Sequence, residues 1–169
     1  ALVRLLDGSE QLPGTVVLAG EAGIGKTALW LAGRDAATDR GYRVLSTRPS
    51  EAEARFSFGG LADLLGGVVE GVLPELPPVQ RRALETALLL GETDLRADDR
   101  AVAAAFLGAL RLLAADGPVC LAVDDIQWLD AASLAALRFA LARLEREPVA
   151  GLLALRGDPP EWLRRAVPE

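Results

Sequence analysis

The stretch TVVLAGEAGIGKT, residues 15–27, decides the fold of this chain of 169 residues. Its second part, residues 20–27, has the spacing Gly-x-x-x-x-Gly-Lys-Thr, which is the pattern of a phosphate-binding loop, or P-loop. Glycines allow the backbone to curve so that several N–H groups point inward at one anion. Lys26 is the only lysine of the chain, and its compact ammonium can follow phosphate oxygens better than a planar guanidinium. The pattern therefore predicts a phosphate site.

The residues on both sides of this loop support the same prediction. Residues 15–19 form a β-branched and apolar run, typical of a buried parallel strand, and a helix is expected from residue 28 to about residue 39. The helix would present its free N–H groups and the positive end of its dipole to the same anion. The alternative is a glycine-rich turn that only joins a strand to a helix. The predicted nucleotide-binding residues are Gly20, Glu21, Ala22, Gly23, Ile24, Gly25, Lys26, Thr27 and Ala28.

The composition narrows the classes of protein. With 51% hydrophobic residues, the chain is expected to form one globular domain over residues 1–169. No apolar run is long enough to cross a bilayer, and no signal peptide is recognisable. A single cysteine and no histidine argue against disulfides, zinc sites and Ser-His or Cys-His catalysis. A net charge of −6 argues against contact with nucleic acid.

The composition also indicates where the protein is located and whether the sequence is a complete protein. With one cysteine and no export signal, we expect an intracellular, cytoplasmic protein. Because the chain contains no methionine, we also expect it to be an excised piece of a longer protein.

Strands that alternate with helices predict an α/β fold with a mostly parallel sheet, covered by helices on both faces. Besides residues 15–19, strands are expected at residues 42–47, 119–123 and 149–155. A helical insert is expected between the second and third strands, with helices at residues 61–69, 78–90 and 99–115. Further helices are expected at residues 131–147, with Asp130 as the N-cap, and at residues 161–165.

A pair of carboxylates, Asp124 and Asp125, directly follows the apolar run at residues 119–123. Because ligands of open α/β sheets bind at the carboxyl ends of the strands, the pair should emerge at the edge that carries the P-loop. We assign Asp124, together with the Thr27 hydroxyl, to Mg²⁺. Asp125 is then the general base that polarises the attacking water. The alternative is that both acids only cap the next turn.

Arg156 is expected at the end of the fourth strand, and thus at the same edge. A cation there could contact the γ-phosphate of a nucleotide; the alternative is an ordinary solvated arginine. Glu51 and Glu53 could approach the nucleotide from the loop after the second strand, although a solvated loop is the simpler interpretation. The candidate catalytic residues are Lys26, Asp125 and Arg156.

Several phrases of the chain resemble one known family. They are GEAGIGKT at residues 20–27, VDDIQWLDAASL at residues 123–134, LALR at residues 153–156 and FSFGGLADLL at residues 56–65. Together they resemble the ATPase domain of the STAND class of P-loop NTPases, and in particular that of the large LuxR-type bacterial transcriptional regulators. The resemblance implies a three-layer αβα sandwich with ATP or ADP and Mg²⁺ as its ligands.

The resemblance also implies a regulatory switch that hydrolyses ATP slowly and couples its nucleotide state to inducer sensing and oligomerisation. Lys26 matches the P-loop lysine, Thr27 the magnesium threonine, Asp124 and Asp125 the two Walker B acids, and Arg156 the sensor arginine. The implied partners are the nucleotide, other domains of the parent chain and further copies in a nucleotide-dependent homo-oligomer. An arginine finger from a neighbour is left open, and no contact with nucleic acid or membrane is expected.

Parts of the family pattern are expected outside residues 1–169. These are an upstream Gly-Arg-Glu segment, a fifth core strand, a winged-helix region and the DNA-binding helix-turn-helix. We therefore expect hydrolysis by this segment alone to be weak or absent.

Two other functions fit the sequence. A small-molecule kinase also uses a P-loop, and the helical insert at residues 61–115 could hold its acceptor pocket, although the phrase Asp-Asp-Ile-Gln-Trp argues otherwise. A non-catalytic interaction module would use the nucleotide only to stabilise its fold. Phosphate transfer from labelled ATP to an acceptor identifies the first, and thermal stabilisation without phosphate release identifies the second.

Overall fold

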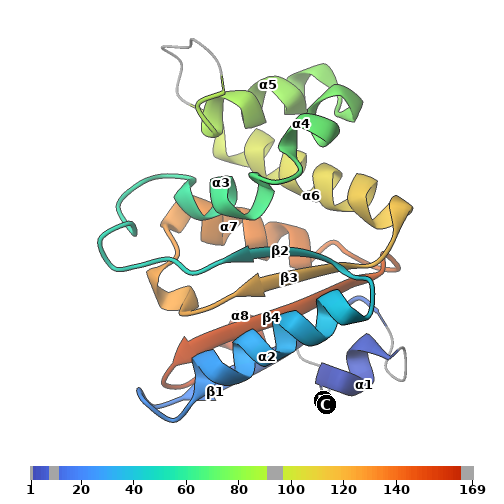
Figure 1. Ribbon diagram of the computed structural model, residues 1–169. Coiled ribbons are helices and arrows are strands. Elements are labelled where there is room, and N and C mark those ends of the chain that lie inside the picture. The colour runs from blue at the N-terminus through green and yellow to red at the C-terminus, as the bar shows by residue number, and fades with distance from the viewer. Residues whose placement is uncertain (1, 8–11, 91–96, 165–169) are drawn as a thin grey trace.

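The computed structural model of the protein describes residues 2–7, 12–90 and 97–164 (Figure 1). At its centre lies a four-stranded sheet in which every pair of neighbouring strands is parallel. The strand order is β1-β4-β3-β2, so the last of these strands in the sequence lies between the first and the third. The α/β prediction and the four predicted strands are confirmed. The strands are β1 (Gly14–Gly20), β2 (Arg43–Thr47), β3 (Val119–Val123) and β4 (Val149–Arg156).

Helices cover both faces of the sheet. On one side lie α1 and α2, and on the other lie α3, α6 and α7, as Figure 1 shows. The helices are α1 (Leu2–Leu6), α2 (Lys26–Asp39), α3 (Gly59–Leu65), α4 (Val69–Val72), α5 (Pro78–Ala87), α6 (Asp99–Asp116), α7 (Ala131–Leu141) and α8 (Glu161–Arg164), with short 3₁₀ turns η1 (Leu73–Glu75) and η2 (Ile126–Trp128).

Each face of the sheet has its own hydrophobic core because side chains alternate along a strand. In β3, Leu121 and Val123 belong to the core shared with α3, α6 and α7. Cys120 and Ala122 belong to the core shared with α1 and α2. The sheet and its two helical layers form the predicted αβα sandwich. Burial raises the pKa of the Cys120 thiol to about 12, so this group stays protonated and is a poor nucleophile.

The helical insert between β2 and β3 is present, and most of it lies away from the sheet. Both α4 and α5 pack on α6, and Figure 1 shows them on its outer side. One face of α6 is apolar and buried; it consists of Val102, Phe106, Ala109, Leu110 and Leu113. None of the helices in the described residues combines the length and the apolar character that a membrane crossing needs.

Two predicted helices are shorter in the structure. The helix expected at residues 61–69 ends at Leu65, and α4 begins at Val69, because Gly66 and Gly67 favour helix weakly. The helix expected at residues 131–147 ends at Leu141. Residues 142–148 instead form a connection to β4. The proline at position 148 disfavours helix at Glu147, and the N–H groups of Glu145 and Arg146 bond to the Glu147 carboxylate rather than to helix carbonyls.

Other boundaries shift by fewer residues. The expected strand at residues 42–47 begins at residue 43, and the expected helix at residues 78–90 ends at residue 87. Arg165, the predicted last residue of the helix expected at residues 161–165, lies outside the described residues.

Candidate functional site

The P-loop connects the carboxyl end of β1 to the first residue of α2, Lys26. Gly23 and Gly25 have φ angles of 83° and 92°, a left-handed conformation that glycine adopts without a steric penalty. The loop therefore curls in front of α2, whose first N–H groups have no partner within the helix. No side chain caps these groups. The loop thus leaves backbone N–H groups for an anion.

Lys26 folds back into this loop. Its Nζ donates to the backbone oxygens of Gly20 and Glu21 at 2.7 and 2.5 Å, and the residue is 9% exposed. The ammonium is therefore held against the same loop that presents the backbone N–H groups. A phosphate bound there would meet both kinds of donor.

Asp124 follows β3 and is buried. Its Oδ2 accepts a hydrogen bond of 3.0 Å from the Thr27 hydroxyl, although the two residues are 97 positions apart in the sequence. Its Oδ1 accepts a hydrogen bond of 3.0 Å from the backbone N–H of Asp125. Because the strands are parallel, the P-loop and this carboxylate emerge at the same edge of the sheet. The two side chains assigned to Mg²⁺ are therefore in contact.

Asp125 has a left-handed backbone with φ 47°, and its side chain has partners different from those of Asp124. Its Oδ1 accepts from Gln127 Nε2 at 2.8 Å and from Arg156 Nε at 3.4 Å. Gln127 Oε1 in turn accepts from the backbone N–H of Arg156 at 3.2 Å. These three residues join the ends of β3 and β4. The side chains of Asp125 and Arg156 are 27% and 52% exposed, so a ligand can reach both.

A hollow of about 460 Å³ lies at this edge of the sheet. It includes Glu51, whereas the Glu53 carboxylate accepts from the hydroxyl and the N–H of Ser50 at 2.6 and 3.0 Å. These hydrogen bonds, that of the hydroxyl first, lower the pKa of Glu53. Two arginines and three carboxylates thus surround the hollow. Its lining residues are Arg48, Pro49, Ser50, Glu51, Asp124, Asp125, Trp128 and Arg156.

Thr27 and Asp124 fit Mg²⁺ by their chemistry, because a hydroxyl and a carboxylate are hard oxygen ligands. In phosphate sites, Mg²⁺ usually takes only one or two protein ligands and completes its octahedron with phosphate oxygens and water. Within the described part of the chain, no group of three or more His, Cys, Asp or Glu could hold a metal ion. The residues present therefore suit a metal that arrives with a nucleotide rather than one caged by protein alone.

Two residues of this site had no predicted role. Arg48 Nε lies 3.4 Å from Asp124 Oδ2, and Gln127 connects Asp125 to Arg156. Arg48 directly follows β2, so the signal that singled out Asp124 and Arg156, a position just after a strand, also applies to it. No sequence signal shows that the Gln127 amide joins two strands.

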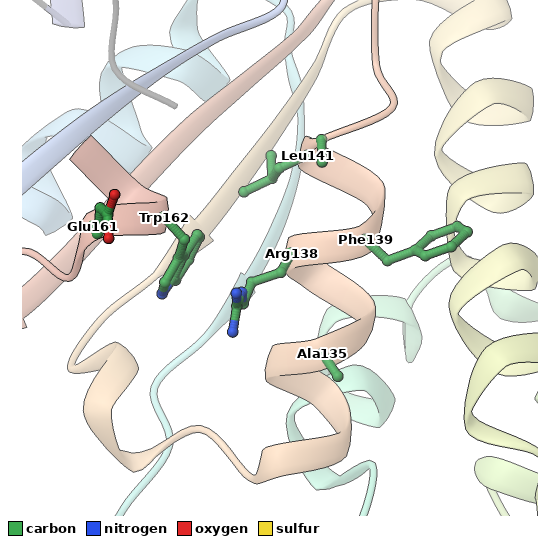
Figure 2. Close-up of a pocket in the computed structure, with 7 residues that line it drawn as sticks. Ala135, Arg138, Phe139, Leu141, Glu161 and Trp162 are labelled. Carbon is green, nitrogen blue, oxygen red and sulfur yellow. The ribbon is translucent and has the colours of Figure 1, made fainter. Parts of the chain in front are cut away.

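A larger hollow, of about 980 Å³, lies between α7 and α8 (Figure 2). It is lined mainly by apolar side chains, and Figure 2 shows Arg138 directed toward Trp162, with its guanidinium carbon 5.2 Å from the ring centre. Among the described residues that line it, there is none of the predicted site residues. The volume of a hollow therefore does not identify the functional site. The polar side chains that converge at the edge of the sheet are the better indication.

The fold and the site define a nucleotide-binding domain of the P-loop class. The family model described as the AAA ATPase domain matches residues 1–153, and the chain belongs to this family. AAA ATPases generally use ATP and Mg²⁺, in agreement with the curled glycine loop and the oxygen ligands next to it. No match was found among curated proteins, and none among solved structures.

Proposed function

We propose that this domain is the ATP-dependent switch of a LuxR-type bacterial transcriptional regulator of the STAND class. The observation that carries the ATP-dependent part is the contact between Thr27 and Asp124, because it joins the P-loop to an acid nearly a hundred residues away. The LuxR-type assignment is supported by the phrases at residues 20–27 and 123–134. The proposal includes a cytoplasmic location, contact with other domains of the parent chain and a nucleotide-dependent homo-oligomer.

In this proposal each residue at the edge of the sheet has a separate task. The P-loop N–H groups and the Lys26 ammonium hold the β- and γ-phosphates. Thr27 and Asp124 provide oxygen atoms for Mg²⁺, Asp124 directly or through a water ligand. When bound, Mg²⁺ neutralises charge that develops on the phosphate oxygens.

Asp125 and Arg156 form the part of the site that responds to the γ-phosphate. Asp125 accepts a proton from the attacking water. Arg156 already donates to Asp125, so a phosphate next to it competes with that carboxylate for the guanidinium. The connection between the ends of β3 and β4 then differs between the ATP and ADP states, which is what a switch requires.

The substitution Lys26→Ala tests nucleotide binding. We expect isothermal titration calorimetry to show Mg²⁺-dependent ATP binding by the wild-type chain and none by the variant at the same concentrations, because the only ammonium of the P-loop is lost. The comparison variant is Lys26→Arg, which keeps the charge but not the compact geometry and should bind ATP only weakly. Unchanged binding by Lys26→Ala would refute the assignment of this loop to phosphates.

The regulator role is tested separately by the parent chain. A helix-turn-helix encoded after residue 169 in the same reading frame would support it. A parent protein with a metabolic enzyme domain in that place would contradict it, while leaving nucleotide binding by the P-loop intact.

A further inference from the structure

Arg48 brings a second arginine-bearing strand end, besides that of Arg156, into the proposed nucleotide site. It directly follows β2, and its Nε lies 3.4 Å from Asp124 Oδ2. The Arg48 side chain is 56% exposed, whereas that of Asp124 is 3% exposed. A largely exposed cation therefore contacts a carboxylate that is itself shielded from solvent.

The Arg48 guanidinium also lies over the ring of Trp30. Trp30 is fully buried in α2, and the guanidinium carbon of Arg48 lies 5.9 Å from its ring centre. A cation at this distance from an indole ring is attracted by the electron-rich face. A second arginine, Arg34, lies 5.7 Å from the same ring centre, but it is bonded to Asp35 rather than to Asp124.

Two hydrogen bonds and one ion pair engage the Asp124 carboxylate. Its Oδ2 faces both the Thr27 hydroxyl and the Arg48 guanidinium, and its Oδ1 faces the N–H of Asp125. A carboxylate offers about four lone-pair positions. A metal ion next to Thr27, or a water ligand of that metal, needs one lone-pair position of Asp124 Oδ2. Of the two partners of this oxygen, Arg48 is the exposed one, so it can give up its contact.

We propose that Arg48 is a positioning residue that competes with Mg²⁺ for the Asp124 carboxylate. It holds the buried acid in place without metal and gives up this contact when metal and nucleotide bind, so it sets the metal concentration that the site requires. This inference rests on the proposed nucleotide site. A phosphate ligand would strengthen nucleotide binding, whereas Arg48 in this role weakens the binding of the metal.

The experiment measures ADP binding by calorimetry at a series of Mg²⁺ concentrations, for the wild-type chain and for Arg48→Ala. Because ion pairs with one exposed partner are weak, the expected change is small. We expect the Mg²⁺ concentration that gives half of the maximal increase in ADP affinity to fall about two- to fivefold in the variant. Arg48→Lys retains a cation and should restore a value near that of the wild type. Arg34→Ala removes the other arginine over Trp30 and should leave the value unchanged.

Mn²⁺ added at a fixed concentration of ADP provides a second arm with a spectroscopic signal. The free ion is followed by electron paramagnetic resonance, and its affinity should rise by a similar factor in Arg48→Ala, with thermal unfolding as a check that the variant is folded. If Arg48→Ala instead weakens ADP binding at every Mg²⁺ concentration with the same midpoint, Arg48 is a phosphate ligand and the inference is wrong. An unchanged midpoint together with unchanged Mn²⁺ affinity also overturns it. A wild-type chain that binds no ADP would count against the proposed function itself, whereas ADP binding with an unchanged Mg²⁺ midpoint overturns only the role of Arg48.

Discussion

At the scale of the residue, two adjacent acids have different partners. Asp124 is buried against Thr27, whereas Asp125, with its left-handed backbone, contacts Arg156 and remains partly exposed. Aspartate tolerates this backbone conformation better than most residues do. Two neighbours in the sequence therefore have different surroundings, in agreement with the separate tasks at metal and water that we propose for them.

Asp125→Asn tests the second of these tasks. We expect the variant to bind Mg²⁺ and ATP as the wild type does, because the asparagine keeps the shape of the side chain. In the full-length parent protein, where we expect hydrolysis, a single-turnover assay should show that the variant is slower by about 10²- to 10⁴-fold, which is typical for the loss of a general base. Asp124→Asn is the control, and it should instead weaken Mg²⁺-dependent binding. Equal turnover by Asp125→Asn and the wild type would remove Asp125 from the role of base.

The sequence predicted where these residues lie but not all of their contacts. The carboxyl ends of parallel strands lie at the same edge of a sheet, which depends only on chain direction. This places Asp124 and Arg156 at the edge of the sheet that carries the P-loop. The contacts of Arg48 and Gln127 depend on side-chain conformation and on the order of the strands. No motif encodes the insertion of β4 between β1 and β3, and this order decides which strand ends are neighbours.

At the scale of the element, α3 begins on the first turn of α7. The buried Asp130 carboxylate accepts from the backbone N–H groups of Phe58, Gly60 and Ser133 at 2.8, 3.1 and 2.9 Å. The Ser133 hydroxyl accepts from Leu61 N–H at 2.9 Å. The sequence predicted Asp130 as the cap of its own helix, which is confirmed. Its second role, as the cap of a helix seventy residues earlier, depends on tertiary packing.

Asp130→Ala should therefore destabilise the fold more than an ordinary helix cap does. The substitution leaves buried N–H groups of α3 without an acceptor, so we expect the free energy of unfolding to fall by about 2–4 kcal/mol, measured by urea denaturation. Asp98→Ala is the matched control, because Asp98 is exposed and accepts only from Ala101 N–H at the start of α6. Its loss should cost about 1 kcal/mol. Equal losses in the two variants would contradict the dual role of Asp130.

At the scale of the whole molecule, Glu147 ties the helical insert to the sheet. It precedes β4, and its carboxylate accepts from the N–H groups of Glu145 and Arg146 at 2.7 and 3.1 Å and from Arg111 of α6 at 2.7 Å. The bond from Glu145 first, and that from Arg111 in addition, lower the pKa of Glu147 to about 2. A lowered pKa means that the ionised form stabilises the fold above the usual pKa of glutamate, about 4.3.

This stabilisation should disappear as the pH falls from about 5 toward 2. We expect Glu147→Gln to lower the free energy of unfolding at pH 7 by about 1–2 kcal/mol, since its partners are partly solvated. The gap between wild type and variant should narrow at pH 3. Urea denaturation at both pH values measures it, with Glu145→Gln as the control because Glu145 joins this network through its backbone. A gap of the same size at both pH values would show that the charge of Glu147 does not matter.

The central position of β4 has a consequence for how a new molecule matures on the ribosome. The glycine loop and the paired acids are both synthesised before β4, which separates their parent strands in the sheet and is the last of the four strands to be made. A nascent chain that has not yet released residue 156 lacks both the spacer strand and the arginine at its tip. We therefore expect the P-loop and the two acids to come together only after translation has passed β4.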